Sequence, residues 1–101
     1  MASSIAFKTF ILDQLQYLDN IEIKPMMGEF LLYYKGILFG GIYDDRFLIK
    51  ITNSNKQYYL KTEIPYNNAK PMYMVENLDN PEYLMNIIKD TCKDLQNKKP
   101  S

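Results

Sequence analysis

The side chains of this sequence that could transfer protons or hold a metal are few and widely spaced. Histidine, the commonest general base and metal ligand, is missing from all 101 residues. The adjacent carboxylates of Asp44 and Asp45 could hold a divalent ion, but an Asp pair between two apolar runs is more typical of a turn. Asp90 and Asp94 lie one helical turn apart with lysines beside them, which indicates a solvated face. We therefore expect no catalytic residues and no metal site.

The sulfur-containing side chains offer a second possible route to chemistry. Cys92 is the one cysteine, so an intramolecular disulfide is impossible, and we expect a small buried side chain on a helix. Thioether ligands for a soft metal could come from Met26, Met27, Met72 and Met74. Methionine more often fills a core or an interface, so these residues predict packing rather than metal binding.

Glycines, lysines and tyrosines are the residues of this sequence that could form a site for a cofactor or another small molecule. No glycine-rich phosphate loop is present: Gly40 and Gly41 lie inside a strand pattern, where a bulge or close packing is the usual reason. We therefore expect no cofactor. A small-molecule-binding or enzymatic pocket near Lys50, Tyr66 and Tyr73 is an alternative function, which a deep cavity with buried polar side chains would favour.

Composition and charge narrow the function classes. Apolar residues make up 47% and charged residues 24% of the chain, which predicts one globular domain over residues 1–101. Basic and acidic residues number 12 each, whereas a protein that binds DNA by itself usually carries a basic excess. The basic cluster of Lys98 and Lys99, with Lys93 nearby, fits a frayed end. We expect no direct DNA binding, no membrane span and, since no secretory signal is visible, a cytoplasmic location.

The first half of the chain predicts one helix followed by strands. A helix over residues 4–18, capped by Ser3 or Ser4, would gather its apolar side chains on one side. Residues 21–24 alternate apolar and polar as a half-buried strand does, and Pro25 ends that strand or holds it at a sheet edge. Three more strands, joined by turns at residues 35–36 and 44–45, cover residues 29–34, 37–43 and 46–51.

The next segment predicts a short helix, a loop and a strand. Residues 52–55 are polar and can cap a short helix over residues 56–62. Residues 64–70 contain a proline and two adjacent asparagines, which indicate a loop. Residues 71–75 then form a fifth strand, with two methionines on one of its faces.

The last helix has a clear beginning in the sequence. Asp79 or Asn80 caps it, Pro81 takes the first helical position, and Lys98 and Lys99 suit its C-terminal end. The predicted order is helix, four strands, short helix, strand, long helix. Helices at both ends of an antiparallel meander indicate the α+β class, with two layers: a five-stranded antiparallel sheet and the helices packed on it.

The two tight turns predict which strand residues share a face. Two-residue loops would pair Tyr34 with Ile37 and Tyr43 with Arg46, and opposed residues lie on the same side of a sheet. One face, a platform for the helices, would carry Leu31, Tyr33, Leu38, Ile42, Phe47, Ile49 and Ile51. The opposite face would carry Leu48 and an expected interaction surface of Phe30, Leu32, Tyr34, Ile37, Phe39, Tyr43, Arg46 and Lys50.

This second face is too apolar for a free two-layer domain to leave in water. Three explanations stay open. The short helix and the loop over residues 64–70 wrap over the face, a second copy of the chain covers it in a homodimer, or another partner binds there. A bulge at either turn would exchange the two faces and change the assignment.

The signature of a known family is visible in residues 26–39, MMGEFLLYYKGILF. They resemble the TfoX/Sxy N-terminal domain family, in which methionine, an aromatic residue and glycine lead into a strand ending in tyrosine, followed by a turn glycine and a strand with phenylalanine. Residues 45–50 are similar to the family's next strand, which closes on a lysine. Further likeness extends over residues 65–66, 69–73 and 78–80, and to the Lys-Lys-Pro ending.

The resemblance implies both a fold and a function. The fold would be a two-layer α+β domain similar to that of secretion chaperones. The function would be linked to the regulation of competence (DNA uptake) genes, where longer members, which carry a second helical domain, act as coactivators with a cyclic-AMP-responsive activator. Glu29 and Leu31 stand where the family often has glycine, and Met27 where it often has an aromatic residue. We expect a bacterial, stand-alone short member: a non-enzymatic protein-interaction module that binds a transcription factor or a second copy of itself.

Overall fold

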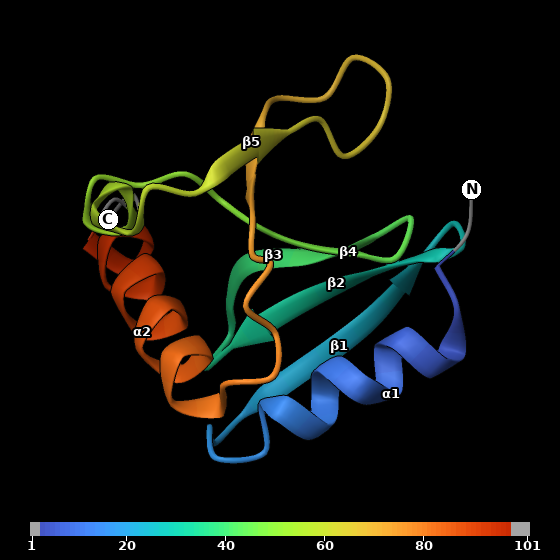
Figure 1. Ribbon diagram of the computed structural model, residues 1–101, viewed down its shortest axis with the longest axis horizontal. Helices are drawn as coiled ribbons and strands as arrows, with labels where there is room; N and C mark the ends of the chain where they lie inside the picture. Colours follow the sequence, from blue (N-terminus) through green and yellow to red (C-terminus); the bar gives the residue numbers. More distant parts are fainter. Residues whose placement is uncertain (1–2, 98–101) are drawn as a thin grey trace.

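The computed structural model describes residues 3–97 and consists of one antiparallel sheet with two α-helices packed on its inner face (Figure 1). The expected role of Lys98 and Lys99 lies outside these residues. Across the sheet the strands follow the order β1-β2-β3-β4-β6-β5. The predicted α+β class with an antiparallel sheet is confirmed, with six strands in place of five. In chain order the elements are α1 Ile5–Gln14, β1 Ile21–Met26, β2 Glu29–Tyr34, β3 Ile37–Tyr43, β4 Arg46–Ile49, the 3-10 helix η1 Ser54–Tyr58, β5 Lys61–Glu63, β6 Met72–Met74 and α2 Pro81–Asn97.

The segment predicted as a helix over residues 56–62 folds differently. Helix η1 ends at Tyr58 because Tyr59 takes a φ of 54°, in the left-handed region that interrupts a right-handed helix. Residues Lys61–Glu63 then form β5, which pairs antiparallel with β6 at one edge of the sheet. The prediction is wrong for this strand, since three polar residues give no alternating apolar pattern.

Both α-helices begin where their capping residues predict. The Ser4 Oγ accepts a hydrogen bond from the Phe7 N–H at 3.1 Å, and the Asn80 Oδ1 accepts one from the Tyr83 N–H at 3.1 Å. These bonds satisfy N–H groups that the first turn of a helix leaves without a partner. Helix α1 ends at Gln14, earlier than predicted, and the chain continues in turns towards β1.

Three hairpin turns have positive φ angles at both of their central residues. The turn pairs are Met27 and Gly28 between β1 and β2, Lys35 and Gly36 between β2 and β3, and Asp44 and Asp45 between β3 and β4. Their φ angles lie between 51° and 86°, as in type I′ turns, whose twist matches that of paired strands. The first of these turns makes β1 and β2 a hairpin and places β1, with its Pro25, at the sheet edge.

A β-bulge between β2 and β3 exchanges part of the predicted faces. Tyr34 pairs with Ile37 as expected, but Leu32 pairs with Gly40 instead of Phe39 because the register shifts after the first two pairs from the turn. Phe39 and Ile42 consequently both point into the core, although an unbroken strand would place residues three apart on opposite faces.

The shift moves most of the expected interaction surface to the inner face. Phe30, Leu32, Tyr34, Ile37 and Phe39 belong to the core or pack directly against it. Because Leu32 and Phe39 have no exposed surface, the predicted docking face is wrong for these five residues. The expected platform is right for Ile42, Phe47 and Ile49, which face the helices. It is wrong for four residues that lie on the outer face: Leu31, Tyr33, Leu38 and Ile51.

Two glycines allow the strands to approach closely at the bulge. A Cβ atom on Gly40 would overlap the backbone oxygen of Leu48, and one on Gly41 would lie 2.5 Å from the backbone oxygen of Phe30. The ring of Tyr43 also lies over Gly41, 2.8 Å from where that Cβ would be. The prediction that a bulge or close packing explains these glycines is therefore confirmed.

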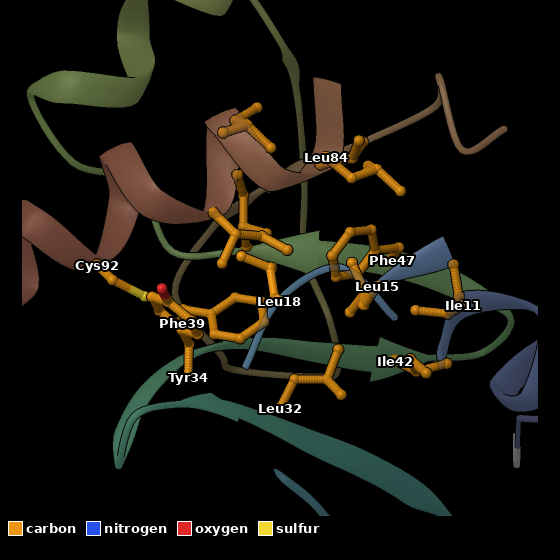
Figure 2. Packing of buried hydrophobic residues seen from close by; sticks show 14 residues of the cluster. Ile11, Leu15, Leu18, Leu32, Tyr34, Phe39, Ile42, Phe47, Leu84 and Cys92 are labelled. Atoms are coloured by element: carbon orange, nitrogen blue, oxygen red, sulfur yellow. The ribbon is translucent and has the colours of Figure 1, made fainter. Parts of the chain in front are cut away.

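The core fills the space between the helices and the inner face of the sheet (Figure 2). Ile11 from α1, Leu84 from α2 and Phe47 from β4 are among its fully buried side chains. Cys92 is buried as predicted, and burial raises the pKa of its thiol from 9.0 to about 12. Within residues 3–97, neither α-helix combines the length and apolar content that a membrane crossing requires.

A buried amide joins η1 to the sheet and to α2. The Asn55 Nδ2 donates hydrogen bonds to the backbone oxygen of Lys50 at 2.7 Å and to the Thr91 Oγ1 at 2.9 Å. The Asn55 Oδ1 accepts one from the Thr52 N–H at 2.9 Å. The polar segment at residues 52–55 thus folds around a side chain that has no exposed surface and uses both of its polar atoms.

Candidate functional site

A cavity lies on the outer face of the sheet, beneath the chain that joins β5 to β6 (Figure 1, the gold loop beside β5). Its volume is about 780 Å³, within the range of small-molecule pockets, and it is partly open to solvent. The floor includes Met26, Leu31, Leu38, Gly40 and Ile51. The roof consists of Pro65, Tyr66, Ala69, Lys70 and Pro71. We refer to this cavity as the outer pocket.

Arg46, the single arginine of the chain, clamps one end of the roof to the sheet. Its Nη1 lies 3.2 Å from the Glu63 Oε1 and donates to the backbone oxygen of Ile64 at 3.3 Å. Its Nη2 donates to the backbone oxygen of Pro65 at 3.2 Å, and its Nε to the backbone oxygen of Tyr43 at 3.1 Å. The planar guanidinium therefore joins the end of β3 to the first residues of the roof.

Ring packing and backbone stiffness also hold the roof in place. The rings of Tyr43 and Tyr66 lie 6.0 Å apart between centroids, a separation typical of aromatic pairs. The Ala69 N–H donates to the backbone oxygen of Tyr66 at 3.1 Å, which closes a turn in the middle of the roof. Pro65 and Pro71 fix φ at its two ends. These contacts within the chain therefore fix the roof over the outer face of the sheet.

The polar groups of the outer pocket are two ammonium groups and two phenols. Lys50 and Lys70 line it with Tyr43 and Tyr66, among side chains that are otherwise apolar. Burial raises the pKa of the Tyr43 phenol above 10.0, and Tyr66 and Glu29 add to this shift, so Tyr43 stays protonated at neutral pH. The pocket can thus accept an apolar body and an anionic group.

Residues 13–91 match the TfoX N-terminal domain. The chain belongs to this family. The family resemblance expected from residues 26–39 is therefore confirmed, and it covers every residue that lines the outer pocket.

A curated relative of this TfoX-family member is also similar in sequence. It is the "Uncharacterized 12.7 kDa protein in trpE 5'region" of Spirochaeta aurantia, 28% identical over 80 residues. The similarity covers 77% of this chain and 70% of the relative. The likeness therefore extends over most of both proteins, and the name of the relative assigns no activity.

Only some of the site residues predicted from the sequence lie at the outer pocket. Tyr43, Arg46 and Lys50 lie at the outer pocket or its roof, where their role in an interaction stays a prediction. In the alternative pocket hypothesis, Lys50 and Tyr66 do line one cavity, whereas Tyr73 packs against the core on the inner face. Sequence reasoning missed Leu31 and Leu38 as outer-face residues, and the signal that could have placed them is the glycine pair at residues 40–41.

The acidic residues singled out in the sequence have structural partners. The Asp44 and Asp45 side chains belong to a turn, as predicted, and the Asp44 N–H donates to the Glu29 Oε2 at 3.0 Å. The expectation of a solvated face is wrong for Asp90 and Asp94, because the Tyr58 hydroxyl donates to the Asp90 Oδ2 at 2.5 Å and the Ser54 N–H donates to Asp94. Within residues 3–97, no three His, Cys, Asp or Glu side chains gather where they could hold a metal ion.

Proposed function

We propose that this chain is a non-enzymatic regulatory module of the competence-related kind that its family suggests, and that the outer pocket is its binding site. In this proposal it works in the cytoplasm, and its effect on transcription passes through contact with a protein partner. Membership of the TfoX N-terminal family supports the regulatory role. The observation that carries the choice of site is a mostly apolar pocket within the family-matched residues.

The pocket lining favours binding over catalysis. General acid–base catalysis needs groups that exchange protons near neutral pH. Among the described residues that line the outer pocket there is no carboxylate, and burial moves the pKa of the Tyr43 phenol further from neutrality. Apolar side chains with a few polar groups at the margin are instead typical of a recognition site.

The surface around the pocket supports contact with another molecule. Tyr66 in the roof and Ile64, which directly precedes the roof, expose 58% and 47% of their surface. Exposed apolar and aromatic side chains beside a pocket form the kind of patch on which binding anchors cluster. The three residues of the expected interaction surface that remain on this side, Tyr43, Arg46 and Lys50, are consistent with that role.

The proposal is tested with a variant whose side chain fills the outer pocket, introduced into the organism that encodes the chain. The Ala69→Trp variant places an indole beneath the roof, and Tyr17→Trp, at a side chain 69% exposed, is the matched control. We expect Ala69→Trp, at normal abundance, to alter the transcripts of DNA-uptake genes and the transformation frequency as a gene deletion does. The control should behave like the wild type. Normal transcripts and normal uptake in the Ala69→Trp strain would rule out the proposal.

A further inference from the structure

We propose that the outer pocket binds a single-chain anionic amphiphile, with its alkyl chain on the apolar floor and its carboxylate beside Lys50 and Lys70. The proposal rests on the proposed function only in taking the outer pocket as the binding site. It adds the chemical class of the ligand, and it does not depend on which genes the chain regulates.

The floor and roof provide the apolar half of the site. Leu31, Leu38 and Ile51 line the floor with Met26, and Pro65 and Pro71 line the roof. Arg46, the tyrosine pair and the prolines fix the roof over the sheet, and a cavity of about 780 Å³ lies between these apolar side chains. An alkyl chain that displaced the water would therefore gain binding free energy with each methylene that it buries.

The two lysines provide the charged half of the site. The carboxylate of Glu63, which lies near the roof, is already engaged by Arg46 at 3.2 Å and by Lys61 at 3.9 Å. Within the described part of the chain, Lys50 and Lys70 have no carboxylate within 4.0 Å. Two ammonium groups without ion-pair partners at the margin of an apolar cavity favour a ligand with a negative charge at one end.

The shape of the site favours a thin ligand over a folded partner segment. A helix with its side chains is about 10 Å wide, and it would have to lift a roof that Arg46, the tyrosine pair and two prolines hold down. An extended alkyl chain can enter a partly open cavity without displacing the roof. The volume of about 780 Å³ also lies within the small-molecule range.

The test titrates the purified chain with laurate, below its micelle concentration, by isothermal titration calorimetry. We expect one laurate to bind per chain, and decanoate, two methylenes shorter, to bind roughly tenfold more weakly. Dodecanol keeps the alkyl chain but lacks the charge, and it should bind at least about fivefold more weakly than laurate. Added salt should weaken the binding of laurate and not that of dodecanol.

Paired variants separate the two halves of the site. The double variant Lys50→Gln/Lys70→Gln should lose at least about fivefold in affinity for laurate and nothing for dodecanol. Lys89→Gln/Lys93→Gln removes the same charge from exposed positions on α2 and should bind laurate as the wild type does. Ala69→Trp should abolish binding of both ligands, and its circular dichroism spectrum and urea midpoint should show that it is folded.

Three results would overturn the ligand class: no binding of laurate, equal binding by Ala69→Trp, or full affinity in the Lys50→Gln/Lys70→Gln variant. Binding to phosphatidylglycerol vesicles without binding of free laurate would also overturn it, since a membrane surface would then be the partner. If laurate fails to bind while Ala69→Trp still abolishes regulation, the proposed function stands and only this ligand is lost. If laurate binds while Ala69→Trp regulates normally, the ligand stands and the proposed function is lost.

Discussion

At the scale of single residues, the buried side chain of Asn55 joins three parts of the chain by hydrogen bonds. In the Asn55→Ala variant, the Lys50 carbonyl, the Thr91 hydroxyl and the Thr52 N–H would each lose a hydrogen-bond partner inside the protein. We expect this variant to lower the free energy of unfolding by about 2–3 kcal/mol, measured by urea denaturation. Asn53→Ala is the control, because Asn53 is exposed and makes only a 3.5 Å contact with the Lys56 Nζ. Equal losses in the two variants would contradict this role.

The residue scale is also where the sequence is most informative. Ser4, Asn80, Asp44 and Asp45 take the capping and turn roles that their side chains predict, because those roles depend on neighbours within a few positions. Asn55, in contrast, also has a hydrogen-bond partner that is distant along the chain. Thr91 lies 36 positions away along the chain, so no local pattern predicts that contact.

At the scale of elements, one extra residue in β3 reversed the predicted faces of all of β2 and of the start of β3. Turn pairings near Tyr34 and Tyr43 are both predicted correctly, and the error enters between them, at the bulge beside Gly40. Alternation has a period of two, so every residue of β2 changes sides at once. The glycine pair was a sign that a bulge was possible, but the sequence pattern could not show where the register shifts.

Arg46 makes the largest set of hydrogen bonds that hold the connection between β5 and β6 in position. Arg46→Met keeps the length of the side chain but removes the guanidinium that binds Glu63 and the backbone oxygens of Ile64 and Pro65. Charge-assisted hydrogen bonds are worth about 1.5–3 kcal/mol each. We therefore expect the amide of Ala69, which closes the turn in the roof, to exchange its hydrogen at least about tenfold faster, measured by NMR.

The comparison variant for this experiment is Lys61→Met. It removes a charge from an exposed side chain that lies 3.9 Å from Glu63 and makes no other described contact with the roof. The exchange of the Ala69 amide should stay near the wild-type rate in this variant. An unchanged rate in Arg46→Met, or an equal increase in both variants, would mean that the roof does not depend on Arg46.

At the scale of the whole molecule, the outer pocket exists because segments far apart in the sequence assemble around it. Its lining runs from Met26 in β1 to Met72 in β6 and includes parts of four further segments. The sequence could suggest Lys50 and Tyr66 as parts of one site only as a hypothesis, since both line one pocket only because the roof crosses the sheet there. The layers of the fold were predictable from periodicity, whereas the site requires the completed topology.

The stability of the whole molecule should fall in alkali. Burial raises the pKa of the Cys92 thiol from 9.0 to about 12, and burial with the hydrogen bond to Asp90 raises the pKa of Tyr58 from 10.0 to about 12. Above about pH 9 the unfolded chain loses these protons while the folded chain retains them, so the unfolded state binds fewer protons and the free energy of unfolding decreases as pH rises. The thiol alone contributes a slope of about 1.4 kcal/mol per pH unit between its two pKa values.

Urea midpoints measured from pH 7 to pH 11 would follow this decrease, with no change from these groups below about pH 8. The Cys92→Val variant keeps a small apolar side chain at that position but has no thiol to titrate. Its free energy of unfolding should therefore fall less steeply above pH 9, by about 1.4 kcal/mol per pH unit. The tyrosine contribution would remain, and Tyr58→Phe should reduce it in turn. A midpoint that stays constant up to pH 11 in the wild-type chain would mean that these groups titrate alike in the folded and unfolded states.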